Sequence, residues 1–365
     1  MPTKKAAKKA GRGQEKTGQA PFFSKELMRW NEEKNTRLMP WKGEKDPYKI
    51  WLSEVMLQQT RVEQGWHYYL RFVKQFPTVA TLAAAKDEAV FKLWEGLGYY
   101  SRCRNLLAAA RQIMTAHGGK FPTHYSEIIQ LKGVGAYTAA AIASFAFSQN
   151  YAVVDGNVIR LLARYFGIEQ ACDSTEGKKK FANLAQELID PNDPSAYNQA
   201  IMDFGATVCK PAAPACSDCP LQKKCVALAS NKISQLPVKT KKIQKRERWL
   251  YYAIIHGPKG TLVKERLGKD IWKHLFDFPG LERTDFAEFN TGWWEKWLLE
   301  QYGIKATCRQ ISAPLSQVLT HQNIKAVFIQ FTTRAAKDIA TFEWATDERL
   351  ALLPFPKIIR DHLGK

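Results

Sequence analysis

The sequence predicts a mostly α-helical protein with a larger helical domain followed by a smaller α/β domain. From Pro21 to about Asn231, Ala- and Leu-rich segments alternate with Gly and Pro stops, the pattern of short helices of roughly 10–15 residues. Beyond residue 248, stretches rich in Ile, Val, Tyr, Phe and Thr are typical of β-strands. Four closely spaced cysteines end the helical part.

Size and composition support two folded domains. The chain has 365 residues, of which 45% are hydrophobic, enough for two separate cores. No stretch approaches 18 consecutive apolar residues, so we expect no membrane span. An apolar N-terminal signal segment is also absent, which predicts a cytoplasmic protein.

Positive charge is concentrated in two segments. The net charge is +19, which indicates a polyanionic partner, most often nucleic acid. Residues 1–20 carry six Lys or Arg and one Glu, and residues 231–248 carry seven and one. Charge that merely solvates the chain is the alternative. The expected organisation is a disordered basic tail (1–20), a helical domain (21–230), a basic linker (231–248) and an α/β domain (249–365).

The first segment with a candidate catalytic residue is Trp51–Thr60. Helical spacing places Glu54 on one face with Trp51 and Leu57. A carboxyl group among apolar neighbours has a raised pKa, which suits a general acid near neutral pH. A locally paired surface glutamate is the alternative.

A glycine turn, Leu131–Gly135, lies between two helical stretches, 126–130 and 136–147. Gly133 and Gly135 allow a sharp turn and close approach of the backbone to another surface. The amides of such a turn, followed by a helix N-terminus, can hold a phosphate. An ordinary helix–helix corner is equally consistent with this pattern.

Asp155 follows the glycine turn and stands where an apolar run, Val153-Val154, enters the next helix. An aspartate at this position is most often only an N-cap. Its sequence therefore leaves a structural and a chemical role open.

Four cysteines, Cys209, Cys216, Cys219 and Cys225, have the spacing C-x6-C-x2-C-x5-C within 17 residues. The odd total of seven cysteines and the missing signal segment argue against disulfides. Zinc sites usually combine two C-x2-C pairs, and this loop has one. The spacing favours an iron–sulfur cluster, with structural zinc as the alternative.

In the C-terminal part, Trp249–His256 and Val318–Thr332 are predicted strands, and the Trp-rich segment from Asp285 to Tyr302 is a predicted helix. This arrangement indicates a small α/β domain.

The order of these segments resembles that of the helix-hairpin-helix DNA glycosylases with an iron–sulfur cluster, over roughly residues 22–230. Within this superfamily, the segments are most similar to the adenine DNA glycosylase family. The similar segments are Trp51–Thr60, Gly96–Arg102, Leu131–Ala139, Val154–Val158 and Asn198–Gly205.

The resemblance implies a two-lobed helical fold with a 4Fe-4S cluster on the four cysteines. It also implies that a monomer flips adenine out of double-stranded DNA, where the adenine is mispaired with 8-oxoguanine or guanine, and cuts its N-glycosidic bond. Glu54 would protonate the adenine and later activate water, and Asp155 would stabilise the oxocarbenium ion or trap it covalently. Asn157 would orient water or Asp155.

Tyr137 separates two subclasses. In endonuclease III-like enzymes a lysine at this position forms a Schiff base with the sugar and then breaks the strand. A tyrosine cannot form an imine, so the resemblance implies base excision without efficient lyase activity. Lys132 would contact a phosphate, and Gln59 and Tyr99 would wedge into the base stack. The cysteine loop would present Lys210, Lys223 and Lys224 to the DNA backbone.

The C-terminal domain resembles a Nudix (MutT-like) domain, through Ile271–Glu282. No R-E-x-x-E-E cluster follows Gly280, so no magnesium-dependent pyrophosphatase site is expected. The family reads 8-oxoguanine with a Phe-Ser/Thr-His motif, and here the equivalent is Leu319, Thr320 and His321. The hydroxyl and the imidazole are kept, and the aromatic ring is not.

Two other functions remain open from the sequence. One is a bifunctional endonuclease III-like glycosylase and lyase, which Tyr137 opposes. The other is a DNA-binding protein with a 4Fe-4S cluster and no activity, which would need neither Glu54 nor Asp155.

Overall fold

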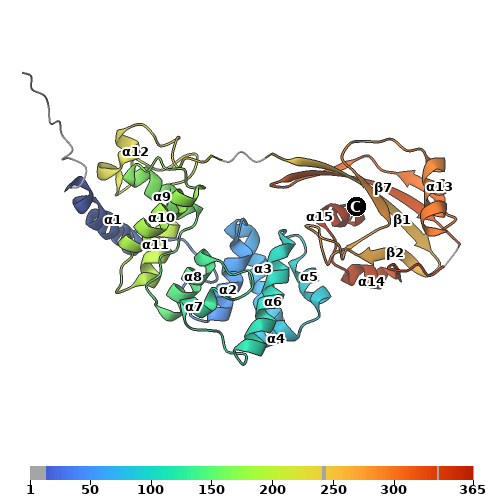
Figure 1. Ribbon diagram of the computed structural model, residues 1–365, viewed down its shortest axis with the longest axis horizontal. Coiled ribbons are helices and arrows are strands. Elements are labelled where there is room, and N and C mark those ends of the chain that lie inside the picture. Colours follow the sequence, from blue (N-terminus) through green and yellow to red (C-terminus); the bar gives the residue numbers. More distant parts are fainter. Residues whose placement is uncertain (1–13, 241–243, 335–336, 365) are drawn as a thin grey trace, which may run out of the picture. The chain divides into compact units, whose positions relative to one another are not determined.

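The computed structural model describes residues 14–240, 244–334 and 337–364 (Figure 1). The chain divides into two compact units. Unit 1 combines Met1–Val62 with Gln112–Lys241, and unit 2 combines Glu63–Arg111 with Lys242–Lys365. The chain therefore divides within the helical region, and the helices of residues 63–111 group with the C-terminal sheet. These units do not coincide with the expected domains 21–230 and 249–365.

Unit 1 is helical. Its elements are α1 (Gln14–Glu33), α2 (Pro47–Leu57), α7 (Tyr125–Ile128), α8 (Ala136–Phe147), α9 (Gly156–Phe166), α10 (Thr175–Leu188), α11 (Pro194–Thr207), the 3-10 turn η1 (Gln222–Lys224) and α12 (Val226–Ala229). One apolar core joins α1, α9, α10, α11 and the segment after the cysteines. Helix α8 packs against both α2 and α11, and these contacts assemble the site.

Helix α1 begins earlier than expected. Residues 14–20 are helical, so the expectation of a disordered tail over 1–20 is wrong for them. Phe23 and Leu27 are fully buried against the core of unit 1, and their burial supports the helix on its N-terminal side. Residues 1–13 of the expected tail lie outside the described residues.

The helices α3 to α6 connect the two parts of unit 1 and lie largely in unit 2. Their bounds are α3 (Val62–Gln75), α4 (Val79–Ala84), α5 (Asp87–Trp94) and α6 (Tyr100–Ala116). Helix α5 contacts the C-terminal domain through an ion pair between Glu88 and Arg349 and through Lys92, which donates to the Leu353 carbonyl at 3.0 Å. These contacts explain why the segment groups with the sheet.

In the part of the C-terminal domain that the structure describes, eight strands form one mixed sheet with the order β3-β2-β1-β7-β5 along its main path. The strands are β1 (Arg246–Gly257), β2 (Gly260–Glu265), β3 (Phe276–Asp277), β4 (Gly280–Arg283), β5 (Thr307–Ile311), β6 (Leu315–Val318), β7 (Gln322–Thr332) and β8 (Glu343–Ala345). The helices are α13 (Thr291–Tyr302), α14 (Asp347–Leu352) and α15 (Lys357–Leu363).

The sheet is covered on both faces, with α13 and α15 on opposite sides of β1 and β7 (Figure 1). Strand β1 runs parallel to β7, and its residues alternate between the two faces. Tyr251 and Ile255 pack with Trp294 of α13. On the other face, Phe328 stacks on His362 of α15 at 3.9 Å between ring centroids. The predicted α/β domain is confirmed.

Three expected boundaries in this region are wrong. The strand predicted from Val318 to Thr332 is interrupted, because residues 319–321 form a turn between β6 and β7. The helix expected from Asp285 begins at Thr291, since the Asn290 side chain caps it by accepting from the Trp293 amide at 2.8 Å. The linker expected to reach residue 248 ends where β1 begins, at Arg246.

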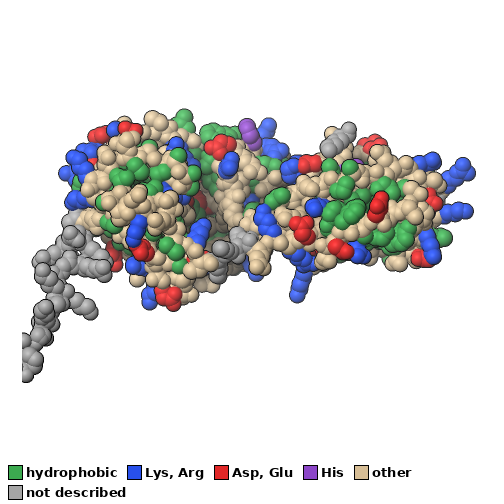
Figure 2. All heavy atoms as spheres, turned by 90° about the horizontal axis from the view of Figure 1, so that it is seen from above, with side chains coloured by type: hydrophobic (Ala, Val, Ile, Leu, Met, Phe, Trp, Pro, Cys, Tyr) green, Lys and Arg blue, Asp and Glu red, His purple; other side chains and the backbone are tan. Residues whose placement is uncertain are grey.

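Lys and Arg side chains are spread over the face of the molecule drawn in Figure 2, as the net charge of +19 requires. Among the described residues, none of the helices combines the length and the hydropathy that a membrane crossing needs.

Candidate active site and cysteine loop

A buried carboxyl group, Glu54, lies on α2. Pro47 at the first turn and the capping side chain of Asp46 start this helix. The Glu54 residue is only 6% exposed. Burial raises its pKa to about 7, with a further contribution from the charge of Asp155 and against a hydrogen bond with Tyr137. Near neutral pH, Glu54 can therefore both give and take a proton.

Tyr137 lies in the first turn of α8 and joins Glu54 to α11. Its hydroxyl donates to the sulfur of Met202 at 3.5 Å, and its interaction with the Glu54 carboxyl group lowers the pKa of Glu54 against the effect of burial. A carboxylate is the stronger acceptor, so Tyr137 donates to Glu54 when Glu54 is ionised. Once protonated, Glu54 can donate to the tyrosine oxygen, and the tyrosine proton can turn to Met202.

Asp155 is the N-cap of α9, which is the structural role that the sequence predicted for it. One of its carboxylate oxygens accepts from the Val158 amide at 2.7 Å, and the other accepts from the Asn157 side-chain amide at 2.7 Å. Burial nevertheless raises the pKa of Asp155. The two donors fix the orientation of the carboxylate, which makes the cap compatible with a chemical role.

Arg160, one turn further along α9, connects Asn157 to the cysteine loop. Its Nη2 donates to Asn157 Oδ1 at 2.8 Å and to the Gly205 carbonyl at 2.6 Å. Its Nε donates to the carbonyl of Cys209 at 2.8 Å. A chain of hydrogen bonds thus runs from Asp155 to the first cysteine.

Asn198 on α11 holds the segment that leads into Asp155. Its carbonyl oxygen accepts from the Val153 amide at 3.0 Å. Its amide nitrogen donates to Ser144 Oγ at 2.8 Å and to the Tyr151 carbonyl at 2.9 Å. Because Asn198 is buried, these bonds tie α8, α11 and the 151–153 segment together away from water.

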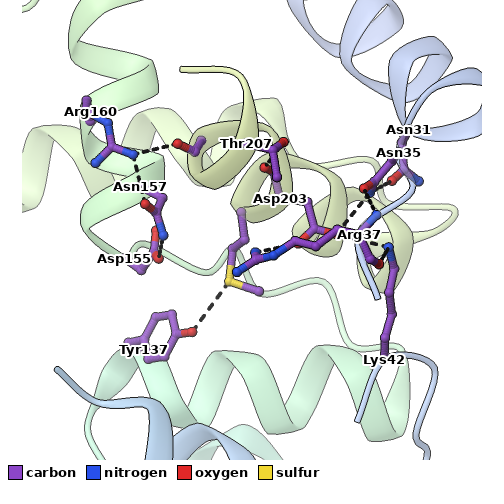
Figure 3. A network of polar contacts seen from close by, with 12 residues as sticks. Asn31, Asn35, Arg37, Lys42, Tyr137, Asp155, Asn157, Arg160, Asp203 and Thr207 are labelled. Atoms are coloured by element: carbon purple, nitrogen blue, oxygen red, sulfur yellow. Dashed lines mark hydrogen bonds and ion pairs between the residues drawn. The ribbon is translucent and has the colours of Figure 1, made fainter. Parts of the chain in front are cut away.

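Asp203, on the same helix, is fully buried and anchors the connection between α1 and α2. It accepts from Arg37 Nη1 at 2.8 Å, Lys42 Nζ at 3.1 Å and Asn35 Nδ2 at 2.9 Å. Figure 3 shows this cluster on the side of the view away from Arg160 and Asp155. Three donors compensate the buried charge.

The glycine turn has the geometry that the sequence predicts at Gly133, where φ is +76°. Gly135 has an ordinary φ of −99°, and a Cβ there would meet nothing within 4 Å. No side chain caps α8, which starts after Gly135. The Lys132 side chain is exposed, and its backbone amide is engaged by Gln112 Oε1 at 3.0 Å.

Gln59 in unit 1 and Tyr99 in unit 2 share a left-handed backbone, with φ of +58° and +49°. Both side chains are exposed. This conformation costs energy for residues other than glycine and is concentrated at functional sites.

The Thr320 and His321 pair lies in the turn between β6 and β7. Within unit 2, the hydroxyl groups of Thr320 and Tyr99 form a hydrogen bond. The structure thus brings together two residues that the sequence singled out separately. The His321 side chain is exposed, and its carbonyl accepts from the Arg246 amide at 3.0 Å.

The four cysteine side chains line one cavity, together with Leu161, Arg164 and Tyr165 of α9. Burial raises the pKa of Cys219 to about 12, and it also raises the pKa of Cys216 and Cys225. Thiols that bind iron or zinc give up these protons.

Four thiols form the donor set of this cavity. The cysteines surround a space, and Arg164 braces it by donating to the Lys210 and Pro211 carbonyls at 2.7 and 2.8 Å. This donor set fits an iron–sulfur cluster with thiolate ligands.

Sequence reasoning did not single out the buried charged residues Arg160, Arg164 and Asp203, or the half-buried Arg37. The available signal was a charged residue within an apolar stripe, as at Arg160 and Arg164 of α9, because such residues are rarely buried without a partner. The partners come from distant segments, so the pairs could not be read from spacing.

Residues 52–191 match the HhH-GPD superfamily of base excision DNA repair proteins, and residues 250–365 match the NUDIX domain. The chain is 35% identical over 266 residues to the adenine DNA glycosylase of Buchnera aphidicola subsp. Acyrthosiphon pisum, an alignment of 73% of this chain and 76% of that protein. The chain belongs to the adenine DNA glycosylase family. It is therefore an enzyme of base excision repair, as the sequence predicted.

Other relatives of the chain agree with this assignment to the family. The Homo sapiens adenine DNA glycosylase is 44% identical over 214 residues, which are 56% of this chain and 39% of that protein. A thermostable thymine-DNA glycosylase of known structure has a TM-score of 0.55 and 27% identity, covering 59% of this chain and 99% of its own. An endonuclease III–DNA covalent intermediate has a TM-score of 0.52 and 20% identity, over 59% and 97%. The predicted helix-hairpin-helix fold is confirmed.

Proposed function

We propose that this protein hydrolyses the N-glycosidic bond of adenine mispaired with 8-oxoguanine or guanine in double-stranded DNA, after flipping the adenine out of the helix. The observation that carries the proposal is the pairing of Glu54, whose pKa burial raises to about 7, with the nearby hydrogen-bonded carboxyl group of Asp155. Two carboxyl groups in different environments suit acid catalysis and cation stabilisation respectively.

In the proposed reaction, protonated Glu54 gives its proton to a ring nitrogen of adenine. The glycosidic electron pair leaves with the base, and the sugar becomes an oxocarbenium ion. Asp155, held by Asn157 and Val158, stabilises this cation. The Glu54 carboxylate then takes a proton from water, whose oxygen bonds to the sugar carbon, and the enzyme returns to its starting state.

Tyr137 supports hydrolysis without strand cleavage. A lyase of this kind needs an amine that can form an imine with the sugar. Tyr137 offers a hydroxyl already engaged with Glu54, so the enzyme has no nucleophilic amine at this position. The endonuclease III-like alternative is disfavoured for this reason.

The glycine turn, together with Gln59 and Tyr99, supports the proposed contacts with DNA. The uncapped N-terminus of α8 can accept a phosphate. The open space at Gly135 permits close backbone approach, and the exposed Lys132 supplies positive charge. Gln59 and Tyr99 would fill the space left by the flipped base.

The remaining assignments concern recognition and the cofactor. The hydrogen bond between Thr320 and Tyr99 supports a role of Thr320 and His321 in reading 8-oxoguanine. The cavity lined by Cys209, Cys216, Cys219 and Cys225 supports a 4Fe-4S cluster, which would brace the loop. One chain supplies every residue of the proposed chemistry, which supports action as a monomer on chromosomal DNA.

An oligonucleotide duplex with a central 8-oxoguanine:A pair tests the function. We expect adenine release, with strand breakage only after alkali. Breakage without alkali would indicate the lyase, and absence of release would indicate a protein that only binds DNA. Matched duplexes with G:A and T:A pairs give the specificity.

Asp155→Asn should abolish adenine release and leave duplex binding intact, because the amide keeps a cap oxygen and loses the negative charge. Duplex affinity, iron content and thermal unfolding measured on the same preparation provide the control. Activity retained within about tenfold of the unmodified enzyme would overturn the catalytic assignment.

A further inference from the structure

We propose that the N-terminal part of α1 covers the cysteine loop and slows the loss of its iron–sulfur cluster, with Gln19 and Phe22 as the covering residues. The inference rests on the proposed cofactor and adds a device that retains it. It concerns residues that are remote from the cysteines in the sequence and that the cysteine pattern does not include.

Two contacts join α1 directly to the last turn before Cys225. Gln19 Nε2 donates to the carbonyl of Lys224 at 3.0 Å. The Lys224 ammonium lies 4.6 Å from the centroid of the Phe22 ring, a cation–π contact. Lys224 immediately precedes Cys225, so both contacts act on the backbone and side chain next to a cysteine ligand.

A second layer connects α1 to the wall of the cavity. The Tyr165 hydroxyl donates to the Gln19 carbonyl at 3.3 Å, and the Tyr165 ring lies 4.9 Å from that of Phe23. Tyr165 lines the same cavity as the four cysteines. Helix α1 therefore contacts the cysteine loop at Lys224 and the cavity wall at Tyr165.

The cover matters because the cysteines themselves are only partly buried. A partly exposed loop can open locally without unfolding the rest of the domain. Opening here requires Lys224 to leave Gln19 and Phe22. Each contact with α1 therefore lowers the fraction of time for which iron is accessible to the solvent.

The sequence predicts that Lys224 faces the DNA backbone, together with Lys210 and Lys223. In the structure Lys224 is exposed, and its ammonium group lies over Phe22, so the lysine is also part of the cover.

The test uses the full-length protein as purified with its cluster. The variants Gln19→Ala and Phe22→Ala are compared with Lys25→Ala, an exposed residue of the same helix. The measurement is the rate of iron transfer to a chelator in anaerobic solution, followed together with the visible absorbance of the cluster. We expect each cover variant to lose iron about fivefold faster, the effect of removing one typical interaction from the closed state. Lys25→Ala should match the unmodified protein.

Thermal unfolding of each variant, measured beside its rate of iron loss, separates the effect of a cover from a general loss of stability. Phe22→Tyr keeps the ring under Lys224, and we expect it to restore the slow rate. Equal rates in all variants, or an equal acceleration in Lys25→Ala, would overturn the cover. Iron-free unmodified protein would instead overturn the cofactor assignment on which the cover depends, so the two failures are distinguishable.

Discussion

Glu54 and Asp155 differ in how the surrounding protein treats their charge. Glu54 is buried next to Asp155, and the Tyr137 hydroxyl offsets only part of the cost of ionising it. Asp155 is also buried, but its two oxygens receive the Val158 amide and the Asn157 side chain. Burial thus disfavours the charge on both carboxyl groups, and the two donors offset part of this cost at Asp155, which suits the proposed acid role of Glu54 and the stabilising role of Asp155.

The first prediction at this scale concerns the pH dependence of adenine release. Because Glu54 must be protonated and its pKa is about 7, the single-turnover rate should fall about tenfold per pH unit above that value. At acidic pH, the rate should fall again as Asp155, whose pKa is also raised, takes up a proton. A rate that stays constant well above neutral pH would contradict the role of Glu54 as the acid.

The second prediction concerns stability. The pKa of Glu54 is raised from 4.5 to about 7 in the folded protein, so ionisation penalises the folded state as pH rises through this window. Glu54→Gln should therefore increase the free energy of unfolding at pH 8 by on the order of 2–3 kcal/mol, with little gain at pH 4. Unfolding by denaturant at each pH measures this free energy. The exposed Glu127→Gln serves as the control, and a gain that does not grow with pH would contradict the prediction.

At the scale of elements, α11 organises the site from behind. Asn198 holds the segment before Asp155, and Asp203 holds the connection between α1 and α2. At Gly205 the helix packs directly on α9. The approach is so close that a Cβ at this position would lie 2.8 Å from the Cβ and the carbonyl oxygen of Asn157. The close contact fixes the residue that orients Asp155.

Gly205→Ala tests this contact. The added methyl group must push α11 away from Asn157, which should lower the free energy of unfolding by about 1–3 kcal/mol and the single-turnover rate by about tenfold or more. Gly292→Ala in α13 is a matched control, since its Cβ would meet only Asn290 Oδ1 at 3.6 Å, and it should be neutral or slightly stabilising. An unchanged rate in Gly205→Ala would show that the packing does not position Asn157.

Sequence patterns predicted elements well where local signals are strong. The helix expected over 136–147 coincides with α8, because a glycine turn ends the preceding segment and an Ala-rich run follows. The helix expected from Asp285 failed at its start, since several polar residues could cap it and the structure uses Asn290. The strand expected from Val318 failed because a short turn without glycine or proline interrupts it.

At the scale of the whole molecule, the C-terminal domain and the helices of residues 63–111 form one compact unit. Within it, the Thr320 hydroxyl meets that of Tyr99. The residue that we propose to read the lesion and the residue that we propose to enter the base stack are thereby connected. We expect this connection to serve discrimination between base pairs.

Thr320→Ala should reduce the preference for 8-oxoguanine:A over G:A more than it reduces the single-turnover rate on the better substrate. Tyr99→Phe removes the same hydrogen bond and keeps the ring, so it should reproduce the loss of preference. Loss of one hydrogen bond corresponds to a decrease of about fivefold in this preference. Rates on both duplexes, measured side by side, decide the matter, and equal losses on the two would argue against the assignment.

The sequence by itself determined the family, the helical and α/β parts, and the residue types of the chemistry. Local signals suffice for these, because a glycine turn, a capping aspartate and a cysteine spacing are properties of contiguous residues. Only the tertiary structure decided how these residues are held. The pKa of Glu54 depends on its burial and on Asp155. The hydrogen bonds of Arg160 and Asp203 reach segments that are remote in the chain. The hydrogen bond between Tyr99 and Thr320 joins residues 221 positions apart. Burial and long-range pairing arise from packing, which no local pattern specifies.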